Sequence, residues 1–218
     1  MSRLYRFCLV PEVEVRLSSS AVRPTPPELR KRVDGLWEAG QQSRWLFDGL
    51  CFSVTSISAS LIKGELVSYR AWYASTQDRS LAKKLAIFPL AVSGHTMNGN
   101  RVLVGRRSPR LASYAGWYEC VPSGTFSDAT CSIAKLITTE LEEEAGLSSS
   151  ISSIQPLALY WSPEDNSWDI HVDIFVDKAP QQITSPSGEY DRLFWADPSE
   201  NFEGEWVPLS KEFLRIRS

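Results

Sequence analysis

The chain has 218 residues, of which 43% are hydrophobic, and eight tryptophans, seven tyrosines and nine phenylalanines supply large side chains for a core. This composition excludes a globally disordered protein. The formal net charge of −3 leaves no basic surplus to neutralise phosphates, which argues against non-specific binding to nucleic acids or membranes.

The four cysteines lie far apart in the sequence, form no C-x-x-C pair, and are accompanied by only two histidines. This spacing argues against a structural zinc site and against a disulfide framework, and we interpret Cys120 and Cys131 as packing residues. The apolar stretch at the N-terminus is interrupted by Arg6 and Pro11, which is atypical of a signal peptide or a membrane span. We therefore expect a cytoplasmic protein.

Residues 1–84 predict short strands and one amphipathic helix. Residues Leu4–Leu17 favour one or two strands, and Thr25-Pro26-Pro27-Glu28 predicts a helix that starts at Thr25 as N-cap and ends near Gly40. Alternating residues near Cys51–Ala59 and Leu66–Tyr73 then predict a hairpin that turns at Lys63-Gly64. A polar, helix-like stretch closes this part at Gln77–Lys84. We interpret residues 1–84 as an N-terminal extension.

Residues 85–218 predict strands, one strong helix, further strands and a short final helix. Asn98-Gly99 is the strongest hairpin signal in the chain and lies between predicted strands at Leu85–Val92 and Arg101–Arg106. Beyond the strong helix, Ile154–Tyr160 and Trp168–Val176 predict strands, and Lys211–Ile216 a short helix. This order of elements is typical of a layered α/β or α+β domain.

The strong helix contains an acidic run, Glu140-Leu141-Glu142-Glu143-Glu144. At about 100° per residue, Glu143 and Glu144 lie roughly 60° and 40° to either side of Glu140, on the face of the apolar residues Ile133, Leu136, Ile137 and Leu141. Glu142 points to the opposite, solvent side. Since acidic runs usually form a solvated face, three glutamates in line with the buried stripe are unusual.

Three clustered carboxylates at the C-terminal end of a helix repel one another and the negative end of the helix dipole. The arrangement needs a cation, and divalent ions that prefer oxygen ligands are the natural candidates. The sequence therefore predicts a metal site formed by Glu140, Glu143 and Glu144.

Here the sequence resembles the Nudix hydrolase family. Glu140, Leu141, Glu143, Glu144, Gly146 and Leu147 match the Nudix box in register, and Pro122-Ser123-Gly124 resembles its preceding turn. The similarity in element order spans about residues 85–209. It implies an α/β/α sandwich with a mixed sheet, and a hydrolase that acts on a diphosphate bond. It also implies Mg²⁺, with Mn²⁺ as an alternative, on the three glutamates and the Gly124 carbonyl.

Three positions depart from the family pattern. Gly124 lies one residue early, Thr139 replaces the box arginine, and Cys131 replaces its first glutamate. The last two side chains commonly pair in the family, so losing both leaves no unpaired charge in the fold. We nevertheless expect catalysis to be weakened or reoriented, and Asp128 is a candidate for the missing acid.

Two groups of residues are candidates for the rest of the site. Arg106 and Arg107 follow a predicted strand and could hold phosphate, while Tyr114 and Trp117 in the next loop could stack on a base. For the general base, or an extra metal ligand, the later carboxylates remain open; they are Glu164, Asp165, Asp169, Asp173, Glu189, Glu203 and Glu205.

The function we expect is Mg²⁺-dependent hydrolysis of a nucleoside diphosphate linked to another moiety. The extension, joined through Ser68-Tyr69-Arg70, is similar to the Nudix subgroup that cleaves UDP-glucose and UDP-galactose, which makes a nucleotide sugar the first choice of substrate. ADP-ribose is the second choice, and a Nudix-like module that binds nucleotides without efficient turnover is the alternative. The expected partner is a small nucleotide rather than a nucleic acid or a membrane. A homodimer is the oligomeric state that we consider.

Overall fold

The computed structural model describes residues 4–9, 12–42, 46, 48–111, 113–128, 132–163, 165–199 and 203–217. Within them an eight-stranded sheet has the order β1-β9-β10-β5-β6-β11, with β7 paired to β6 and β8 to β5. Its strands are β1 (Tyr5–Cys8), β5 (Leu90–Asn98), β6 (Arg101–Arg107), β7 (Tyr118–Cys120), β8 (Ser123–Thr125), β9 (Ile151–Ser162), β10 (Ser167–Val176) and β11 (Tyr190–Ala196). Since β10 runs parallel to β5 and antiparallel to β9, the sheet is mixed, as predicted.

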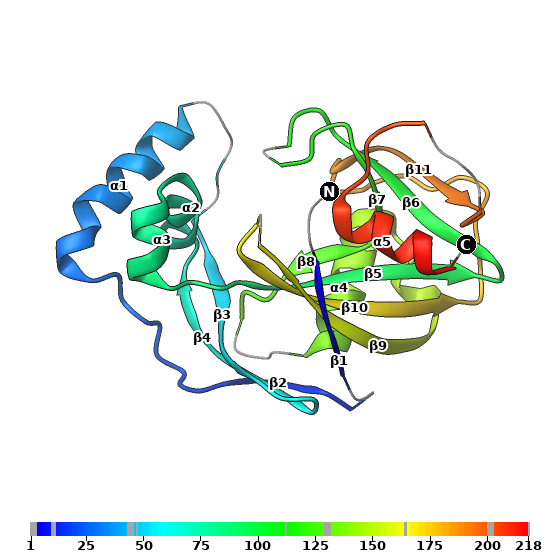
Figure 1. The fold of residues 1–218 in the computed structure, drawn as a ribbon. Coiled ribbons are helices and arrows are strands. Elements are labelled where there is room, and N and C mark those ends of the chain that lie inside the picture. The colour runs from blue at the N-terminus through cyan, green and yellow to red at the C-terminus, as the bar shows by residue number, and fades with distance from the viewer. Residues whose placement is uncertain are drawn as a thin grey trace.

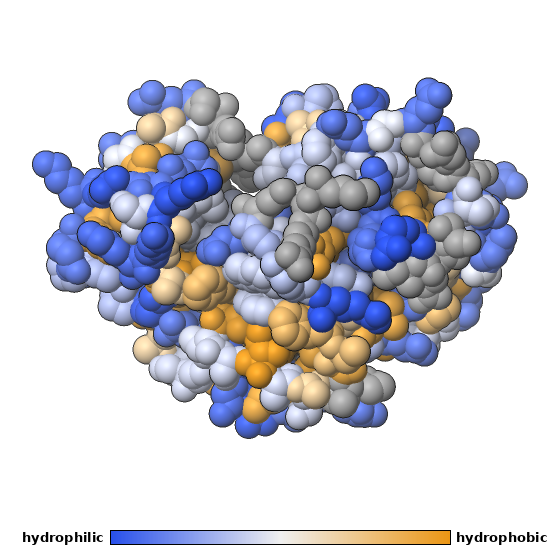
Figure 2. All heavy atoms as spheres, viewed as in Figure 1, coloured by the Kyte–Doolittle hydropathy of each residue, from blue (hydrophilic) through white to orange (hydrophobic). Residues whose placement is uncertain are grey.

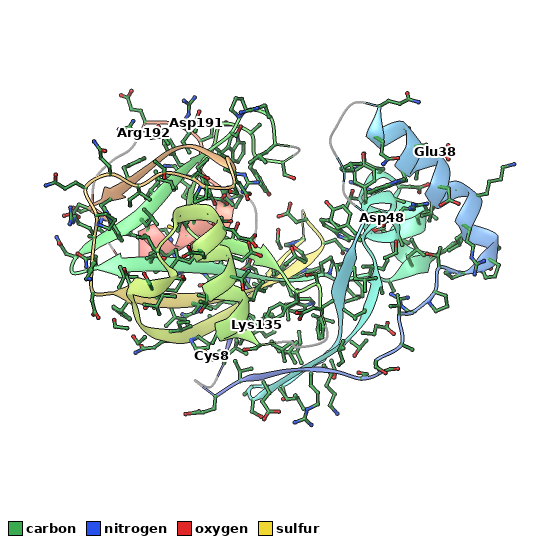
Figure 3. All side chains as sticks on the ribbon, turned by 180° about the vertical axis from the view of Figure 1, so that it is seen from behind. Cys8, Glu38, Asp48, Lys135, Asp191 and Arg192 are labelled. Atoms are coloured by element: carbon green, nitrogen blue, oxygen red, sulfur yellow. The ribbon has the colours of Figure 1, made fainter. Side chains whose placement is uncertain are left out.

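Helices cover both faces of this large sheet. Helix α4 (Ile133–Ala145) lies behind it and α5 (Pro208–Arg217) in front of it in Figure 1, and the order is reversed in the opposite view of Figure 3. On the α5 side, the ring of His95 from β5 stacks on Phe213. The expected α/β/α sandwich is therefore confirmed.

The N-terminal residues form a second, smaller sheet and a group of helices (Figure 1). The sheet has the order β2-β4-β3 and consists of β2 (Glu14–Leu17), β3 (Leu50–Ile57) and β4 (Leu61–Ser68). The helices are α1 (Pro27–Gln41), α2 (Tyr69–Gln77) and α3 (Arg79–Leu85). The helices pack around their own apolar cluster, which includes Leu29, Val33, Leu81 and Leu85.

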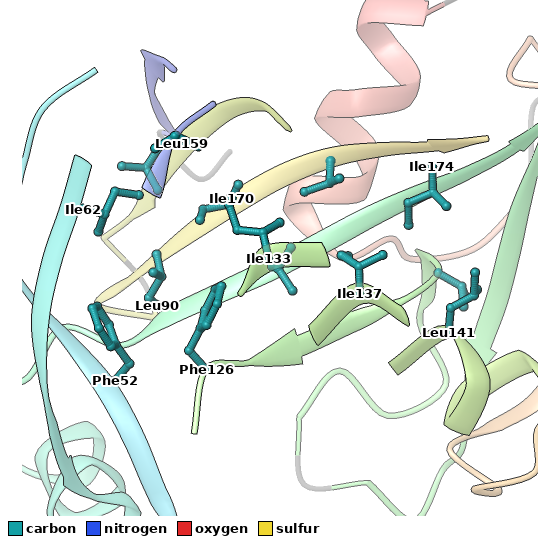
Figure 4. Packing of buried hydrophobic residues seen from close by; sticks show 14 of the residues in the cluster. Phe52, Ile62, Leu90, Phe126, Ile133, Ile137, Leu141, Leu159, Ile170 and Ile174 are labelled. Carbon is teal, nitrogen blue, oxygen red and sulfur yellow. The ribbon is translucent and has the colours of Figure 1, made fainter. Parts of the chain in front are cut away.

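The small sheet shares one hydrophobic core with the large sheet. Phe52 of β3 lies against Phe126, and the same cluster continues through Leu90 to Ile137 of α4 (Figure 4). The backbone N–H of Phe52 also donates to the carbonyl of Phe126 at 2.7 Å. The boundary near residue 84 stays a prediction. Strand β1 precedes that boundary in the chain but belongs to the large sheet, because it pairs with β9 at the edge of that sheet.

Three local predictions in the N-terminal part are wrong. The hairpin turns at residues 58–60 rather than at Lys63-Gly64, and Tyr69–Tyr73 belongs to helix α2, because the Ser68 side chain caps that helix by accepting a hydrogen bond from the N–H of Ala71. Helix α1 begins at Pro27 without a side-chain cap, so Thr25 is not its N-cap.

The remaining features of the fold are the Asn98-Gly99 turn, the length of the helices and the shape of the surface. The Asn98-Gly99 turn is confirmed, with Gly99 in the left-handed region at φ 61°. In the described part of the chain, no helix combines the length and the hydrophobicity needed to cross a membrane. Figure 2 shows a notch between the helices α1–α3 and the large sheet, and apolar side chains below the centre of this face.

Candidate functional site

Helix α4 presents its glutamates from a well-defined scaffold. The Ser132 side chain caps its start by accepting from the N–H of Lys135, and Gly146 ends it in the left-handed conformation. Ile133, Ile137 and Leu141 form its buried stripe (Figure 4). The next position in line with this stripe is occupied by a carboxylic acid, and the helix therefore places a titratable group at the end of its apolar face.

That acid is Glu144, which is only 1% exposed. Both of its carboxyl oxygens accept from the N–H of Ser123, at 3.4 and 3.2 Å, and the Tyr190 hydroxyl lies 3.3 Å from Oε2. Burial raises the pKa of Glu144 well above its usual range, and neighbouring carboxylates add to the rise. Glu144 thus connects the helix to strands β8 and β11.

Glu140 lies one turn earlier on α4 and is half-buried. Burial raises its pKa to about 7, and the neighbouring Glu143 and Glu189 contribute. Gly124 of β8 lies directly against it, because a methyl group at position 124 would come within 2.3 Å of Glu140 Oε1. Gly124, whose carbonyl the family resemblance implies as a metal ligand, therefore lies beside Glu140.

The helix-face prediction is wrong for Glu143. Its side chain is exposed, unlike those of Glu140 and Glu144, because it lies on the outer flank of the last turn of the helix. Glu142 is on the solvent side as predicted, where its carboxylate accepts from the backbone N–H and the hydroxyl of Ser148. Two of the three predicted ligands are thus at the core boundary, and the third faces solvent.

A second set of residues completes the site; the sequence singled out Arg107 and Glu189 of this set, but not Glu119 or Tyr190. Glu119 of β7 is buried and accepts hydrogen bonds from Arg107 and, at 2.8 Å, from the Tyr190 hydroxyl. Arg107 also lies 3.4 Å from Glu189. A hydroxyl has one proton to donate, so Tyr190 cannot satisfy Glu119 and Glu144 together, which favours the protonated form of Glu144.

Glu119 and Glu189 therefore flank the Arg107 guanidinium group, and Glu140 and Glu144 lie near other carboxyl groups of the site. Glu119, Glu140, Glu144 and Glu189 influence one another electrostatically, and Arg107 is the cation that the structure places among them. Burial raises the pKa of Glu189 as well. The surplus of negative charge and the all-oxygen donor set fit a divalent cation. Among the described residues, however, no three His, Cys, Asp or Glu side chains converge as they stand into a group that could hold a metal.

Glu119 and Glu189, two of these four residues, line a pocket of about 580 Å³. One wall comes from helix α2 and the others from the large sheet and the loops around it. Tyr69, Trp72 and Tyr73 contribute aromatic rings on the α2 side, and Tyr114 lies on the wall formed by the loop after β6. Arg107, Glu119, Ser123, Gly124 and Glu189 also line this pocket. A mixed apolar and polar lining of this size suits a small organic ligand.

The predicted substrate-binding residues divide into two groups. Arg107 and Tyr114 line the pocket, and the Tyr114 hydroxyl donates to Asp165 at 2.9 Å. Trp117 is outside the pocket lining and supports Tyr114, with their ring centroids 5.1 Å apart. Arg106 points away to the surface, where it lies 3.4 Å from Asp191, which is labelled in Figure 3.

The later carboxylates, which are the candidates for the general base, also fall into residues that line the pocket and residues that do not. Asp165, Asp169 and Glu189 line the pocket, whereas Asp173 is buried 3.5 Å from His95 and both Glu203 and Glu205 are exposed. Cys131 and Glu164 lie outside the described residues. Asp128, the candidate for the missing box acid, is exposed and lies 3.6 Å from Lys135, so this contact is on the solvent side of α4.

Cys51 and Cys120 are buried, and burial raises the pKa of each thiol to about 12. A thiolate is therefore disfavoured at both positions, in agreement with the interpretation of Cys120 as a packing residue. Cys8 is exposed in β1, away from the pocket lining.

Asp169 gives the site a measurable pH dependence. Burial raises its pKa to about 7. Because the protonated form is favoured in the folded state, its contribution to stability is fully present below the ordinary aspartate pKa and is lost as the pH rises through about 7. We expect Asp169→Asn, which cannot ionise, to gain on the order of 3 kcal/mol relative to the unmodified chain between pH 5 and 8.

Urea unfolding at a series of pH values measures this difference. Asp177→Asn is the matched control, because Asp177 is exposed just after β10. Parallel pH profiles for Asp169→Asn and the unmodified chain would contradict the prediction.

No protein-family model matches the sequence, and no curated protein is a significant match. Solved structures with similarity to the chain include a MutT NUDIX hydrolase from Burkholderia pseudomallei, at 14% identity and a TM-score of 0.43, covering 58% of this chain and 95% of that one. A MutT protein from Methanosarcina mazei Go1 is similar at 18% identity and a TM-score of 0.43, covering 60% and 92%.

A bifunctional NMN adenylyltransferase/ADP ribose pyrophosphatase from Francisella tularensis, complexed with AMP and a Mn ion, is similar at 15% identity and a TM-score of 0.48. The match covers 66% of this chain and 46% of that one. At these identities and TM-scores the likenesses do not assign an activity or a substrate, and the case for a function rests on the residues of the site.

Proposed function

We propose that the chain is a Nudix-type pyrophosphatase that hydrolyses a nucleoside diphosphate linked to another moiety. The observation that supports this most is the position of Glu140, which lies against Gly124 at the pocket while Glu144 is buried beside it. The acidic end of the helix predicted from sequence therefore adjoins a pocket of a size suited to a nucleotide.

Mg²⁺, with Mn²⁺ as the alternative, is the cofactor that we propose. Glu140, Glu143, Glu144 and the Gly124 carbonyl would hold it, and when bound it would neutralise the diphosphate and lower the pKa of a water molecule. The chain itself supplies the remaining functions. Arg107 is fixed by Glu119 and Glu189 at the pocket, where its guanidinium group can orient a phosphate oxygen.

A nucleoside diphosphate sugar such as UDP-glucose is the substrate that we propose first. The aromatic residues of α2 that face the pocket belong to the segment whose sequence resembles the UDP-glucose and UDP-galactose subgroup. ADP-ribose is the second choice. Cytoplasmic localisation and a homodimer stay predictions.

One observation favours the alternative of a nucleotide-binding module without efficient turnover. The carboxyl group of Glu144 already contacts Ser123 and Tyr190, and burial favours its protonated form, so it has to lose a proton before it can bind a metal. A site in which this change is unfavourable would bind nucleotide and turn over slowly.

A substrate panel separates the two functions. With Mg²⁺, we expect the purified chain to hydrolyse UDP-glucose to UMP and glucose 1-phosphate, at least ten-fold faster than ADP-ribose or dinucleotide polyphosphates, with phosphate products followed by chromatography. EDTA should abolish the reaction. Nucleotide binding by calorimetry without release of a monophosphate from any compound would favour the binding module instead.

A further inference from the structure

The pocket lining contains a buried carboxyl group whose hydrogen bonds are incomplete. Asp169 of β10 is 7% exposed, and its Oδ2 accepts from the Ser93 hydroxyl at 2.9 Å. Its Oδ1 makes no hydrogen bond within the described part of the chain. The Nε2 atom of His171 lies 3.8 Å from Oδ1, which is beyond hydrogen-bonding distance.

The neighbouring imidazole does not supply a compensating charge. His171 is buried, and burial lowers its pKa well below the usual range, so the ring is neutral. A buried oxygen without a hydrogen bond carries a free-energy penalty that a donor can relieve. The Oδ1 atom itself is buried, but the Asp169 side chain lines the pocket and is 9% exposed, so a ligand can supply a donor to the part of the carboxyl group that faces the pocket.

The charge around Asp169 restricts which part of a ligand can lie there. Asp165, Glu119 and Glu189 line the same pocket, and Arg107 is the only arginine or lysine among the described lining residues. Arg107 is already paired with Glu119 and Glu189. A phosphate group beside Asp169 would be repelled, so this part of the pocket favours a group that donates hydrogen bonds and carries no negative charge.

The opposite wall favours a sugar ring as that part. Tyr69, Trp72 and Tyr73 present aromatic surfaces to the pocket. Aromatic rings pack on the C–H face of a sugar, while a carboxylate with free lone pairs accepts from its hydroxyl groups. The two types of contact lie in one pocket here.

We propose that Asp169, held in place by Ser93, accepts hydrogen bonds from vicinal hydroxyls on a sugar ring of the substrate and so determines specificity for the hydroxylated compound. The inference rests on the proposed function, because it assumes that a nucleotide sugar occupies the pocket. The hydroxyl pair can belong to the ribose or to the distal sugar, and Ser93 acts as a positioning residue for Asp169.

Two pairs of ligands test this recognition and identify the ring. The first pair is UDP and 2′-deoxy-UDP, which differ on the ribose, and the second is UDP-glucose and UDP-2-deoxyglucose, which differ on the distal sugar. Dissociation constants are measured by calorimetry with Ca²⁺ in place of Mg²⁺, and kcat/KM is measured with Mg²⁺ for the second pair.

We expect the unmodified chain to bind the hydroxylated member of one pair about ten-fold more tightly than its deoxy partner, since a site built for a hydroxyl discriminates against its loss. Asp169→Ala should bind both members of that pair equally. Ser93→Ala, which leaves Asp169 intact, should show an intermediate preference and decides the question if Asp169→Ala does not fold. Asp177→Ala, on the exposed residue after β10, should keep the full preference.

The inference is overturned if Asp169→Ala weakens hydroxylated and deoxy ligands by the same factor in both pairs, since Asp169 would then only shape the pocket. It is also overturned if the unmodified chain shows no preference while hydrolysing UDP-glucose, in which case the proposed function stands alone. A hydroxyl preference that depends on Asp169 but is accompanied by no hydrolysis would support the inference and contradict the pyrophosphatase. Absence of any nucleotide binding would reject both.

Discussion

Replacing Glu140 by glutamine is expected to lower the rate of metal-dependent hydrolysis by on the order of 10²- to 10³-fold. The amide keeps the shape of the side chain against Gly124 but removes the negative charge that a metal needs. The fold should survive, because Glu140 is half-buried and near other carboxylates, so neutralising it relieves repulsion. The measurement is kcat with UDP-glucose at saturating Mg²⁺, together with the Mg²⁺ concentration needed for half-maximal rate.

Glu142→Gln is the matched control on the same helix. Glu142 faces solvent and contacts Ser148, a contact that the glutamine oxygen can keep. Its rate should change by less than about two-fold. A similar loss in both variants would show that the acidic run acts through overall charge and not through a site on one face of α4.

Arg107→Gln is expected to destabilise the fold by about 3–5 kcal/mol, because it leaves the buried Glu119 without its cation. The Arg107 side chain is 12% exposed and lies between Glu119 and Glu189. Arg106→Gln should change stability by at most about 1 kcal/mol, since its side chain is 48% exposed and pairs with Asp191 at the surface. Urea unfolding at neutral pH compares the two neighbouring arginines.

A second substitution checks the cause. If the loss in Arg107→Gln comes from the unpaired carboxylate, then adding Glu119→Gln should recover much of it, because the double variant buries two neutral amides. If the double variant loses the sum of the two single effects, the two residues are not energetically coupled and the description of this ion pair is incorrect.

Local signals in the sequence predicted the elements of the core that depend on short spacing. The stripe Ile133, Ile137 and Leu141 repeats within one helix, and the Asn98-Gly99 turn requires only the left-handed conformation of Gly99. The same periodicity placed Glu140 and Glu144 at the core boundary. The periodicity did not predict that Glu143 is exposed. A helical wheel gives the direction of a side chain, but it does not show how far the rest of the protein extends over that side of the helix.

The other half of the site depends on contacts between distant segments. Glu119, Glu189 and Tyr190 meet only when β7 and β11 pair with β6 on either side, and no periodicity within one segment predicts this. A charged residue in the short strand between Tyr118 and Cys120 was the available signal for Glu119. The α2 wall was missed for another reason: the aromatic residues Tyr69, Trp72 and Tyr73 have high strand propensity, and the Ser68 cap overrode it.

The pairing of strand β1 with β9 has a consequence for how the chain folds. Tyr5 and Cys8 are synthesised long before their partners Trp161 and Ala158. During synthesis, β1 therefore stays without its partner while all the residues between the two strands are made, and Phe7 in particular is an exposed aromatic residue. Such distant pairings close slowly, so the edge of the large sheet should be the last part of the molecule to acquire protection in pulse-labelled hydrogen exchange.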